Sequence, residues 1–181
     1  MDESYQKYTA FLFKERRNQM FQCGEIVMYR FTVSQIKEIV HEKNHDFYLL
    51  HSLDQEYTIF KVPCENEFGH IQPLPSKKEL EESLLQIPNL ICYEIPRNPG
   101  SHYYQEIINT NQLSTWLTLL KTIYCNRLRA VQNHKRINQK QKQYYDFILS
   151  KLSAIYAAVL GKTAGQCETL ILDAFNQYAV N

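Results

Sequence analysis

The sequence is poor in the residues that build linkers and low-complexity segments. It has only 5 Gly and 6 Pro among 181 residues, a composition that argues against a disordered chain. Long apolar runs are also missing: the longest, Ile155–Leu160, is too short to cross a bilayer, so we expect no membrane partner. The amino terminus begins with acidic residues and has no small-residue cleavage site, so we expect no secretory signal.

Cysteines are few, and their number and spacing do not suggest disulfide pairs. The 5 cysteines are odd in number and scattered, and no CxxC occurs. This usage favours reduced thiols in a cytoplasm over a disulfide framework, and it makes a zinc site of the CxxC type improbable. We therefore expect a cytoplasmic chain without a cofactor.

Acidic residues are absent from one long stretch. None lies between Glu106 and Asp146, whereas seven bases do: Lys121, Arg127, Arg129, Lys135, Arg136, Lys140 and Lys142. Residues 1–75 hold 8 Lys/Arg and 11 Asp/Glu, and residues 76–181 hold 12 and 8. The two halves therefore present different charge to their partners. The basic stretch is either a solvated helix face or a phosphate-binding surface, since several bases surround an expected helix start.

What is present in the first half is the pattern of a small antiparallel sheet. Blocks rich in Val, Ile, Tyr and Phe recur at Glu25–Arg30, Gln35–Val40, Asp46–Ser52 and Tyr57–Val62, each closed by polar or turn-forming residues. In the last block neither parity of side chains is wholly polar, which predicts a strand covered on both sides. A curled half-barrel satisfies that condition.

One motif inside this segment suggests an alternative. His41, Glu42 and His45 form H-E-x-x-H, and His51 follows ten residues after His41, the ligand spacing of metzincin zinc proteases. That chemistry needs a helix, with both histidines on zinc and Glu42 as general base. Tyr48 stands where such a helix needs glycine, and no methionine follows the motif. We favour a polar hairpin tip and keep a zinc hydrolase as the alternative.

The second half predicts a helical bundle. Ser76 and Glu79 form a capping box, Pro88 ends that helix, and Asn89–Gly100 is predicted as the joint between sheet and bundle. Further helices are expected after Ser101, Asn111, Asn138 and Thr163, with Gly161 as a C-terminal cap; the apolar stripe after Asn111 includes Trp116, which we expect in the core. Residues 1–19 fit an added helix, a tail, or a leader before a natural start at Met20.

The order of these features resembles one known family. The elements MF-x-x-GE-x-V-x-Y, I-x-x-I, FYLL and KVP-x-EN-x-x-G-x-x-x-L follow the RNA-polymerase-interacting domain of CarD/CdnL-type bacterial transcription regulators. The apolar spacing from Leu113 to Tyr124 and the Ile137–Lys142 segment resemble that family's C-terminal helices, so the similarity covers roughly residues 20–175. The resemblance implies an α+β chain: a Tudor/SH3-like antiparallel half-barrel over 20–75, then a helical domain over 76–181.

The resemblance also implies partners and sites. The sheet domain of that family docks on the RNA polymerase β subunit, and Lys61 holds the place of its basic docking residue; Ile59 on the same strand and Lys43, near a second basic position, complete the expected docking set. The helical domain contacts promoter DNA weakly and through the backbone and minor groove. The residues expected there are Arg97, His102, Arg127, Arg129, Lys135, Arg136, Lys140 and Lys142.

The chain departs from the family in three places. Arg97 is the nearest match, within Pro96–Asn98, to the family's wedge tryptophan, His102 replaces a base, and the loop before Ile137 is longer by about five residues. These departures do not affect the expected polymerase docking, but they argue against open-complex stabilisation. We expect a transcription regulator that is not an enzyme and has no small-molecule substrate; the alternatives are the zinc hydrolase or a protein-interaction module that does not bind DNA.

Overall fold

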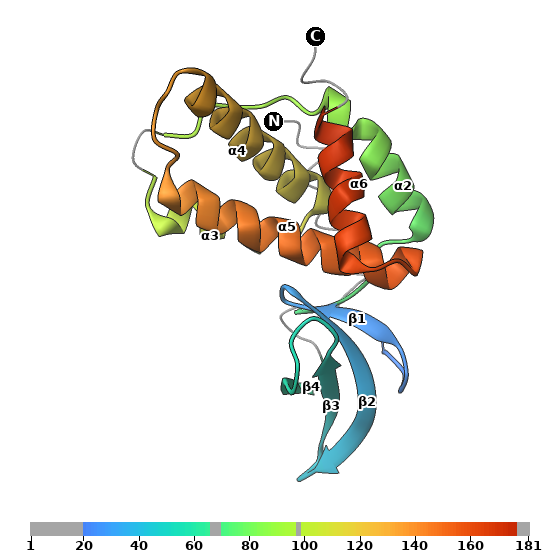
Figure 1. Cartoon of the computed structure of the whole chain (residues 1–181). Helices are drawn as coiled ribbons and strands as arrows, with labels where there is room; N and C mark the ends of the chain where they lie inside the picture. The colour runs from blue at the N-terminus through green and yellow to red at the C-terminus, as the bar shows by residue number, and fades with distance from the viewer. Residues whose placement is uncertain (1–19, 66–69, 97–98, 177–181) are drawn as a thin grey trace, which may run out of the picture. The chain divides into compact units, whose positions relative to one another are not determined.

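A computed structural model describes residues 20–65, 70–96 and 99–176. Residues 1–19, for which the sequence suggests a helix, a tail or a leader, lie outside the described residues. The chain divides into two compact units, Met1–Leu74 and Pro75–Asn181. The predicted joint Asn89–Gly100 therefore lies inside the second unit rather than between the two. An antiparallel sheet followed by helices confirms the predicted α+β fold class (Figure 1).

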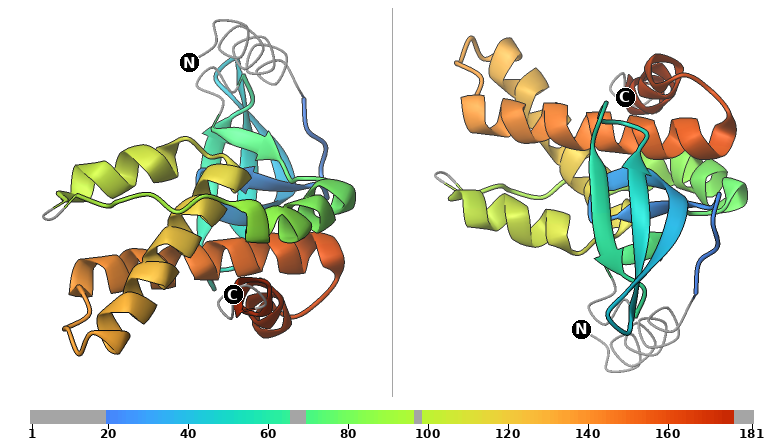
Figure 2. Two further views of the ribbon diagram at one scale, coloured as in Figure 1. Left: turned by 90° about the horizontal axis from the view of Figure 1, so that it is seen from above. Right: turned by 90° about the horizontal axis from the view of Figure 1, so that it is seen from below.

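In the first unit, residues 20–65 and 70–74 form a five-stranded antiparallel sheet with the order β4-β3-β2-β1-β5. Its strands are β1 (Ile26–Tyr29), β2 (Thr32–Glu42), β3 (His45–Ser52), β4 (Ile59–Pro63) and β5 (Ile71–Pro73). The long β2–β3 hairpin is curved along its length (Figure 2), and its register shifts at a bulge between Ile36 and Glu38. A bulge adds one residue to one strand and increases the local twist, which suits a curled sheet. The short β5, which has no pattern signal in the sequence, pairs with β1.

One face of this sheet forms its core. The buried side chains that pack together are Phe21, Val27, Ile36, Tyr48, Leu50, Val62 and Ile71. The backbone N–H of Phe21 donates to the hydroxyl of Tyr48 over 3.0 Å, so the buried phenol has a partner. Desolvation by burial raises the pKa of Tyr48 above its ordinary value. Every second side chain along these strands therefore points into the core.

The expectation of a last strand covered on both sides is wrong. β4 is an edge strand, and Ile59 on its outer face is 57% exposed. Tyr57 lies outside β4 altogether, because its φ of 59° falls in the left-handed region, and its side chain is 98% exposed. A left-handed residue turns the chain, so the strand starts two residues later than its β-rich composition predicts.

The described residues of the second unit form five α-helices and one short 3₁₀ helix. They are α2 (Lys77–Gln86), η1 (Ile87–Asn89), α3 (Ser101–Asn109), α4 (Leu113–Gln132), α5 (Gln139–Leu160) and α6 (Ala164–Asn176). The capping box at Ser76 and the caps at Asn138, Thr163 and Gly161 all form as predicted. The caps predicted at Ser101 and Asn111 do not form. The N-cap of α3 is Gly100, which offers no side-chain cap, and the N-cap of α4 is Gln112.

The helices share one core in which α5 contacts both α4 and α6 (Figure 1). Trp116 is 2% exposed, and its indole N–H donates to the carbonyl of Ile108 over 2.9 Å. The prediction that Trp116 belongs to the core is confirmed. Among the described residues no helix by itself has both the length and the apolar character for a membrane span; α5 and α6 pass that test only as a pair, which is bent by 112°.

Lys121 connects α4 to the residues that follow α2. Its ammonium donates to the carbonyls of Ile87, Pro88 and Leu90 over 2.9, 2.8 and 2.9 Å. These carbonyls belong to the end of a helical segment, where backbone acceptors lack partners and the helix dipole favours a cation. The three bonds use all the donors of one ammonium, so the side chain is partly buried without an unsatisfied proton.

This interaction predicts a large loss of stability for one lysine and not for another. Lys121→Met removes three charge-assisted bonds and leaves three carbonyls without that donor, so we expect the free energy of unfolding to fall by about 2–4 kcal/mol. Lys135→Met is the matched control, because Lys135 is exposed and forms no ion pair within the described residues; it should change stability by less than about 0.5 kcal/mol. Urea unfolding followed by far-UV circular dichroism measures both. Equal effects would contradict this role of Lys121.

Candidate functional site

The outer edge of β4 presents backbone groups to a partner strand. On its inner side, Ser52 N–H donates to Thr58 carbonyl over 2.9 Å and Cys64 N–H to Asp46 carbonyl over 2.8 Å. In an antiparallel ladder the bonded residues alternate with residues whose N–H and C=O point the other way. Ile59 and Lys61 are therefore the residues whose backbone faces outward. No described strand pairs with this side of β4.

The side chain of Lys61 lies along the outer face of the sheet. Its ammonium forms an ion pair with Glu42 of β2 and lies 4.7 Å from the ring centroid of Phe47 of β3. Both charged side chains are about half exposed, so the pair itself contributes little to stability. The two contacts draw the ammonium inward over β3 toward β2, away from the outer edge of β4.

The segment with the H-E-x-x-H spacing forms the tip of the β2–β3 hairpin, as we favoured. Lys43 and Asn44 occupy a two-residue turn, with φ values of 46° and 75°, the pattern of a type I′ turn. Glu42 pairs across the ladder with His45, and His41 pairs with Asp46. Neighbouring residues of a strand point to opposite faces, so His41 and His45 lie on opposite faces of the hairpin. The helix that the zinc-hydrolase alternative requires does not form.

Two bases of the acid-free stretch are engaged inside the helical unit. Lys121 binds three backbone carbonyls, as described above. Arg127 lies with its guanidinium 4.6 Å from the ring centroid of Tyr145, in a stacking contact that orders the side chain. Neither lies on the open surface that the sequence pattern suggests.

Four other bases converge at the connection between α4 and α5. We call Arg129, Lys135, Arg136 and Lys140 the basic tip. Arg129 lies in the last turn of α4, Lys135 and Arg136 in the loop, and Lys140 in the first turn of α5. Three of the four are exposed and Lys140 is half-buried, and none of them forms an ion pair within the described residues. A base in the first turn of a helix opposes the helix dipole, so this placement is not explained by helix stability.

The remaining expected DNA contacts are placed differently. Lys142 lies two residues after Lys140 on α5 and has Asp146 at 3.7 Å, an exposed pair of small energy. His102 lies in the first turn of α3 and is 3.4 Å from Glu106. Arg97 lies outside the described residues. The four residues of the basic tip thus belong to one helix connection, and Lys142 follows them on α5. No described contact links His102 to them.

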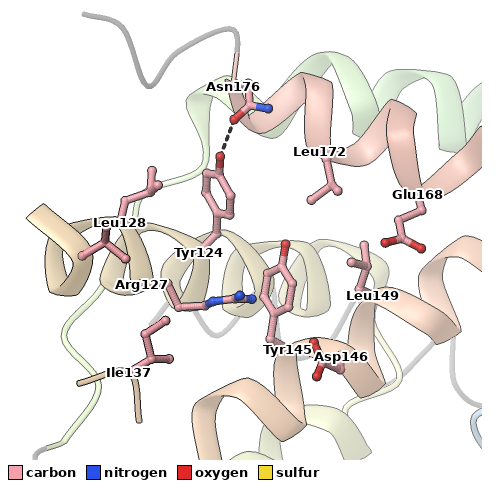
Figure 3. Close-up of a pocket in the computed structure, with 11 residues that line it drawn as sticks. Tyr124, Arg127, Leu128, Ile137, Tyr145, Asp146, Leu149, Glu168, Leu172 and Asn176 are labelled. Atoms are coloured by element: carbon pink, nitrogen blue, oxygen red, sulfur yellow. Dashed lines mark hydrogen bonds between the residues drawn. The ribbon is translucent and has the colours of Figure 1, made fainter. Parts of the chain in front are cut away.

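The helical unit also contains a pocket that sequence reasoning missed. It has a volume of about 440 Å³ and is lined by side chains of α4, α5, α6 and the α4–α5 loop (Figure 3). Arg127 extends over Tyr145, and the hydroxyl of Tyr124 donates to Asn176. Desolvation raises the pKa of Tyr145 to about 12, against the opposing effect of Arg127. Tyr124, Leu128, Tyr145 and Leu149 belong to apolar stripes, whose pattern signals only a core, and the charged lining residues such as Arg127 and Glu168 lie far apart in the sequence.

No protein-family model matches this chain, and no curated protein matches it. The resemblance to CarD/CdnL regulators therefore stays a prediction from the sequence.

The buried phenols predict a fall in stability at alkaline pH. Burial raises the pKa values of Tyr145 and Tyr156 to about 12, above the value of about 10 for an unfolded tyrosine. The folded state thus favours the neutral phenol, a contribution that is complete below pH 10 and is lost as pH rises towards 12. In Tyr145→Phe, urea unfolding should show a loss between pH 10 and 12 that is smaller by about 2 kcal/mol than in the wild type. Tyr57→Phe, at a fully exposed phenol, should follow the wild type; identical pH profiles for all three proteins would contradict the assignment.

Proposed function

We propose that the chain is a non-enzymatic transcription regulator with two binding surfaces. The open edge of β4 binds a strand of the RNA polymerase β subunit, and the basic tip binds the phosphate backbone of promoter DNA. The single observation that supports this most strongly is the basic tip: four bases gather at one helix connection without an acidic partner among the described residues. The resemblance to CarD/CdnL regulators supplies the identity of both partners.

The edge of β4 supports the protein contact. A partner strand can be added where backbone N–H and C=O groups point outward, as those of Ile59 and Lys61 do. Pro63 has no N–H and ends the strand, so the pairing is limited to a short register. Lys61 belongs to this edge strand, and its ammonium is turned inward to Phe47 and Glu42. An acidic side chain on the added strand competes with Glu42 for this charge.

The basic tip supports the DNA contact. Its four positive charges surround the amino-terminal end of α5, where the N–H groups and the dipole also favour phosphate. Asn138 already caps that helix by accepting the N–H of Gln141 over 3.1 Å, so the side chains rather than the free N–H groups supply most of the attraction. Phosphate contacts set position and affinity without reading bases. Since Trp116 is buried in the core, it is not a wedge between base steps.

The DNA contact predicts a defined salt dependence. If three or four residues of the basic tip touch phosphates, log K for duplex DNA should fall with log salt at a slope of roughly −2.7 to −3.6, about −0.9 for each neutralised phosphate. Replacing Lys135 and Arg136 together by Ala should remove nearly two units of slope. Fluorescence anisotropy on a promoter duplex and a scrambled duplex measures the slope, and the two duplexes should bind alike.

A matched double variant controls for net charge. Lys77 and Lys78 on α2 are exposed and each lies 3.8 Å from a glutamate one turn later. Replacing both by Ala removes the same charge from the same unit and should leave the slope unchanged. A wild-type slope near zero, or an equal loss of slope in the two double variants, would show that the basic tip is an ordinary solvated surface. That result would favour a protein-interaction module that does not bind DNA.

The polymerase contact predicts a different set of variants. Lys61→Glu reverses the charge beside the edge and should weaken binding to the β subunit by about 1–3 kcal/mol. Lys61→Pro removes an N–H that points outward, so it should abolish strand addition while leaving the β3–β4 ladder in place. Lys78→Glu makes the same charge change on α2 and should bind as the wild type does. Surface binding to purified β subunit measures all three, with circular dichroism as the check on folding; unchanged affinity of Lys61→Pro would refute the edge assignment.

A further inference from the structure

Two cysteine side chains meet inside the helical unit. The Sγ–H of Cys92 points to Sγ of Cys125 at a distance of 3.4 Å. Cys92 belongs to the extended segment Leu90–Pro96, and Cys125 belongs to α4. All five cysteines lie in the described part of the chain and all are free thiols. This is a contact between residues 33 positions apart, which the spacing of cysteines in the sequence does not predict.

The backbones on both sides of this contact are held in place. On α4, Lys121 lies one turn before Cys125, and its ammonium donates to the carbonyls of Pro88 and Leu90. Leu90 is two residues before Cys92, so the same helix face anchors the segment at one point and meets its thiol at the next. An S–S bond has a length of about 2.04 Å. The two sulfur atoms, 3.4 Å apart, can approach this distance through a change of side-chain rotamer.

We propose that Cys92 and Cys125 form a redox-active dithiol that a peroxide oxidises to an intramolecular disulfide. In the first step the Cys92 thiolate attacks one oxygen of hydrogen peroxide, the O–O bond breaks, and the released hydroxide takes up a proton to leave as water. The product is a sulfenic acid on Cys92. In the second step Sγ of Cys125 attacks that sulfur, its proton goes to the departing hydroxide, and a second water leaves. The two sulfurs lose two electrons in total, and the peroxide gains them.

The surroundings of the two thiols assign these roles. Burial raises the pKa of the Cys125 thiol to about 11. A thiol that seldom ionises is a poor first nucleophile. Once the sulfenic acid forms at a distance of a few ångströms, the second step is intramolecular and is favoured by its high effective concentration. Cys125 is therefore the resolving thiol.

The other cysteines lack such a partner. Cys23 is exposed and its thiol donates to the carbonyl of Lys37 over 2.7 Å, while Cys64 lies in the sheet unit and Cys167 is buried on α6. Among the five thiols, the described contacts between two sulfurs are limited to Cys92 and Cys125. An exposed lone cysteine such as Cys23 instead provides the internal control for unspecific oxidation.

The disulfide has a consequence for the fold. It closes a loop between the extended segment and α4, which restricts the unfolded chain and holds Leu90–Pro96 on the helix face one turn before Arg129. From the loop length of 33 residues, the melting temperature of the helical unit should rise by on the order of 10 °C on oxidation. A thiol-specific reductant should reverse the shift.

The test uses the full chain and hydrogen peroxide. The native protein is treated with peroxide, the remaining thiols are alkylated, and the digest is analysed by mass spectrometry without reduction. We expect one cross-linked peptide pair joining Cys92 to Cys125, lighter by two hydrogens than the sum of its parts, in monomeric protein. Cys23→Ser should keep this product, whereas Cys92→Ser and Cys125→Ser should lose it together with the rise in melting temperature.

Two results would overturn the proposal. One is that Cys92 and Cys125 remain fully alkylated in the wild type at peroxide concentrations that already oxidise the exposed Cys23. The other is that either cysteine is found mainly cross-linked to a different residue or to a second chain. Because both readouts come from the wild-type protein, failure of a serine variant to fold does not affect the decision.

Discussion

Much of the helical unit depends on the hydrogen bonds that the Lys121 ammonium donates to three backbone carbonyls. By binding the carbonyls of Ile87, Pro88 and Leu90, it ends one helical segment and fastens the following extended segment to α4. Few groups can satisfy three convergent carbonyls, because the site requires three donors on one atom. The same contact engages one base of the acid-free stretch inside the unit. It also fastens the segment close to the point where Cys92 meets Cys125. One side chain thus attaches the start of this segment to α4, one turn before the point where the two thiols meet.

The two units offer two kinds of recognition that differ physically. The edge of β4 offers directed backbone groups, so its specificity comes from register and from a few side chains such as Ile59 and Lys61. The basic tip offers charge on a loop and two helix ends, so the proposed binding to DNA should depend on salt and little on sequence. A protein that binds a specific partner through the first and a common polymer through the second acquires selectivity from the former. Weak DNA affinity then suffices, because docking raises the local concentration of DNA.

Local signals in the sequence predicted most of the fold. The capping boxes, the glycine cap after α5 and the hairpin tip depend on neighbours within a few residues, and Trp116 sits within a long apolar stripe. The start of β4 was missed because Tyr57 takes a left-handed conformation that its β-favouring side chain does not suggest. The joint at Asn89–Gly100 was misplaced because its composition predicts an irregular segment but not where that segment packs. Its attachment to Lys121 is a contact across more than thirty residues.

The candidate site was predicted in part. The run of bases was visible in the sequence, but charge counts do not distinguish Arg127, stacked on Tyr145, from Arg136, which is exposed. The place of Ile59 and Lys61 on an outward edge depends on the strand order and the ladder register, both of which are tertiary. The zinc motif shows the opposite error: the letters match, but hairpin pairing puts His41 and His45 on opposite faces.

In the proposed function the two units bind polymerase and DNA at the same time. The most direct measurement compares the affinity of the full chain for RNA polymerase alone with its affinity for the same polymerase assembled on promoter DNA, at one fixed salt concentration. Simultaneous contact predicts binding to the assembled complex that is tighter by on the order of 10–100-fold, an advantage that should disappear when Lys135 and Arg136 are both replaced by Ala. Equal affinities for polymerase with and without DNA, or no binding to either, would contradict the account.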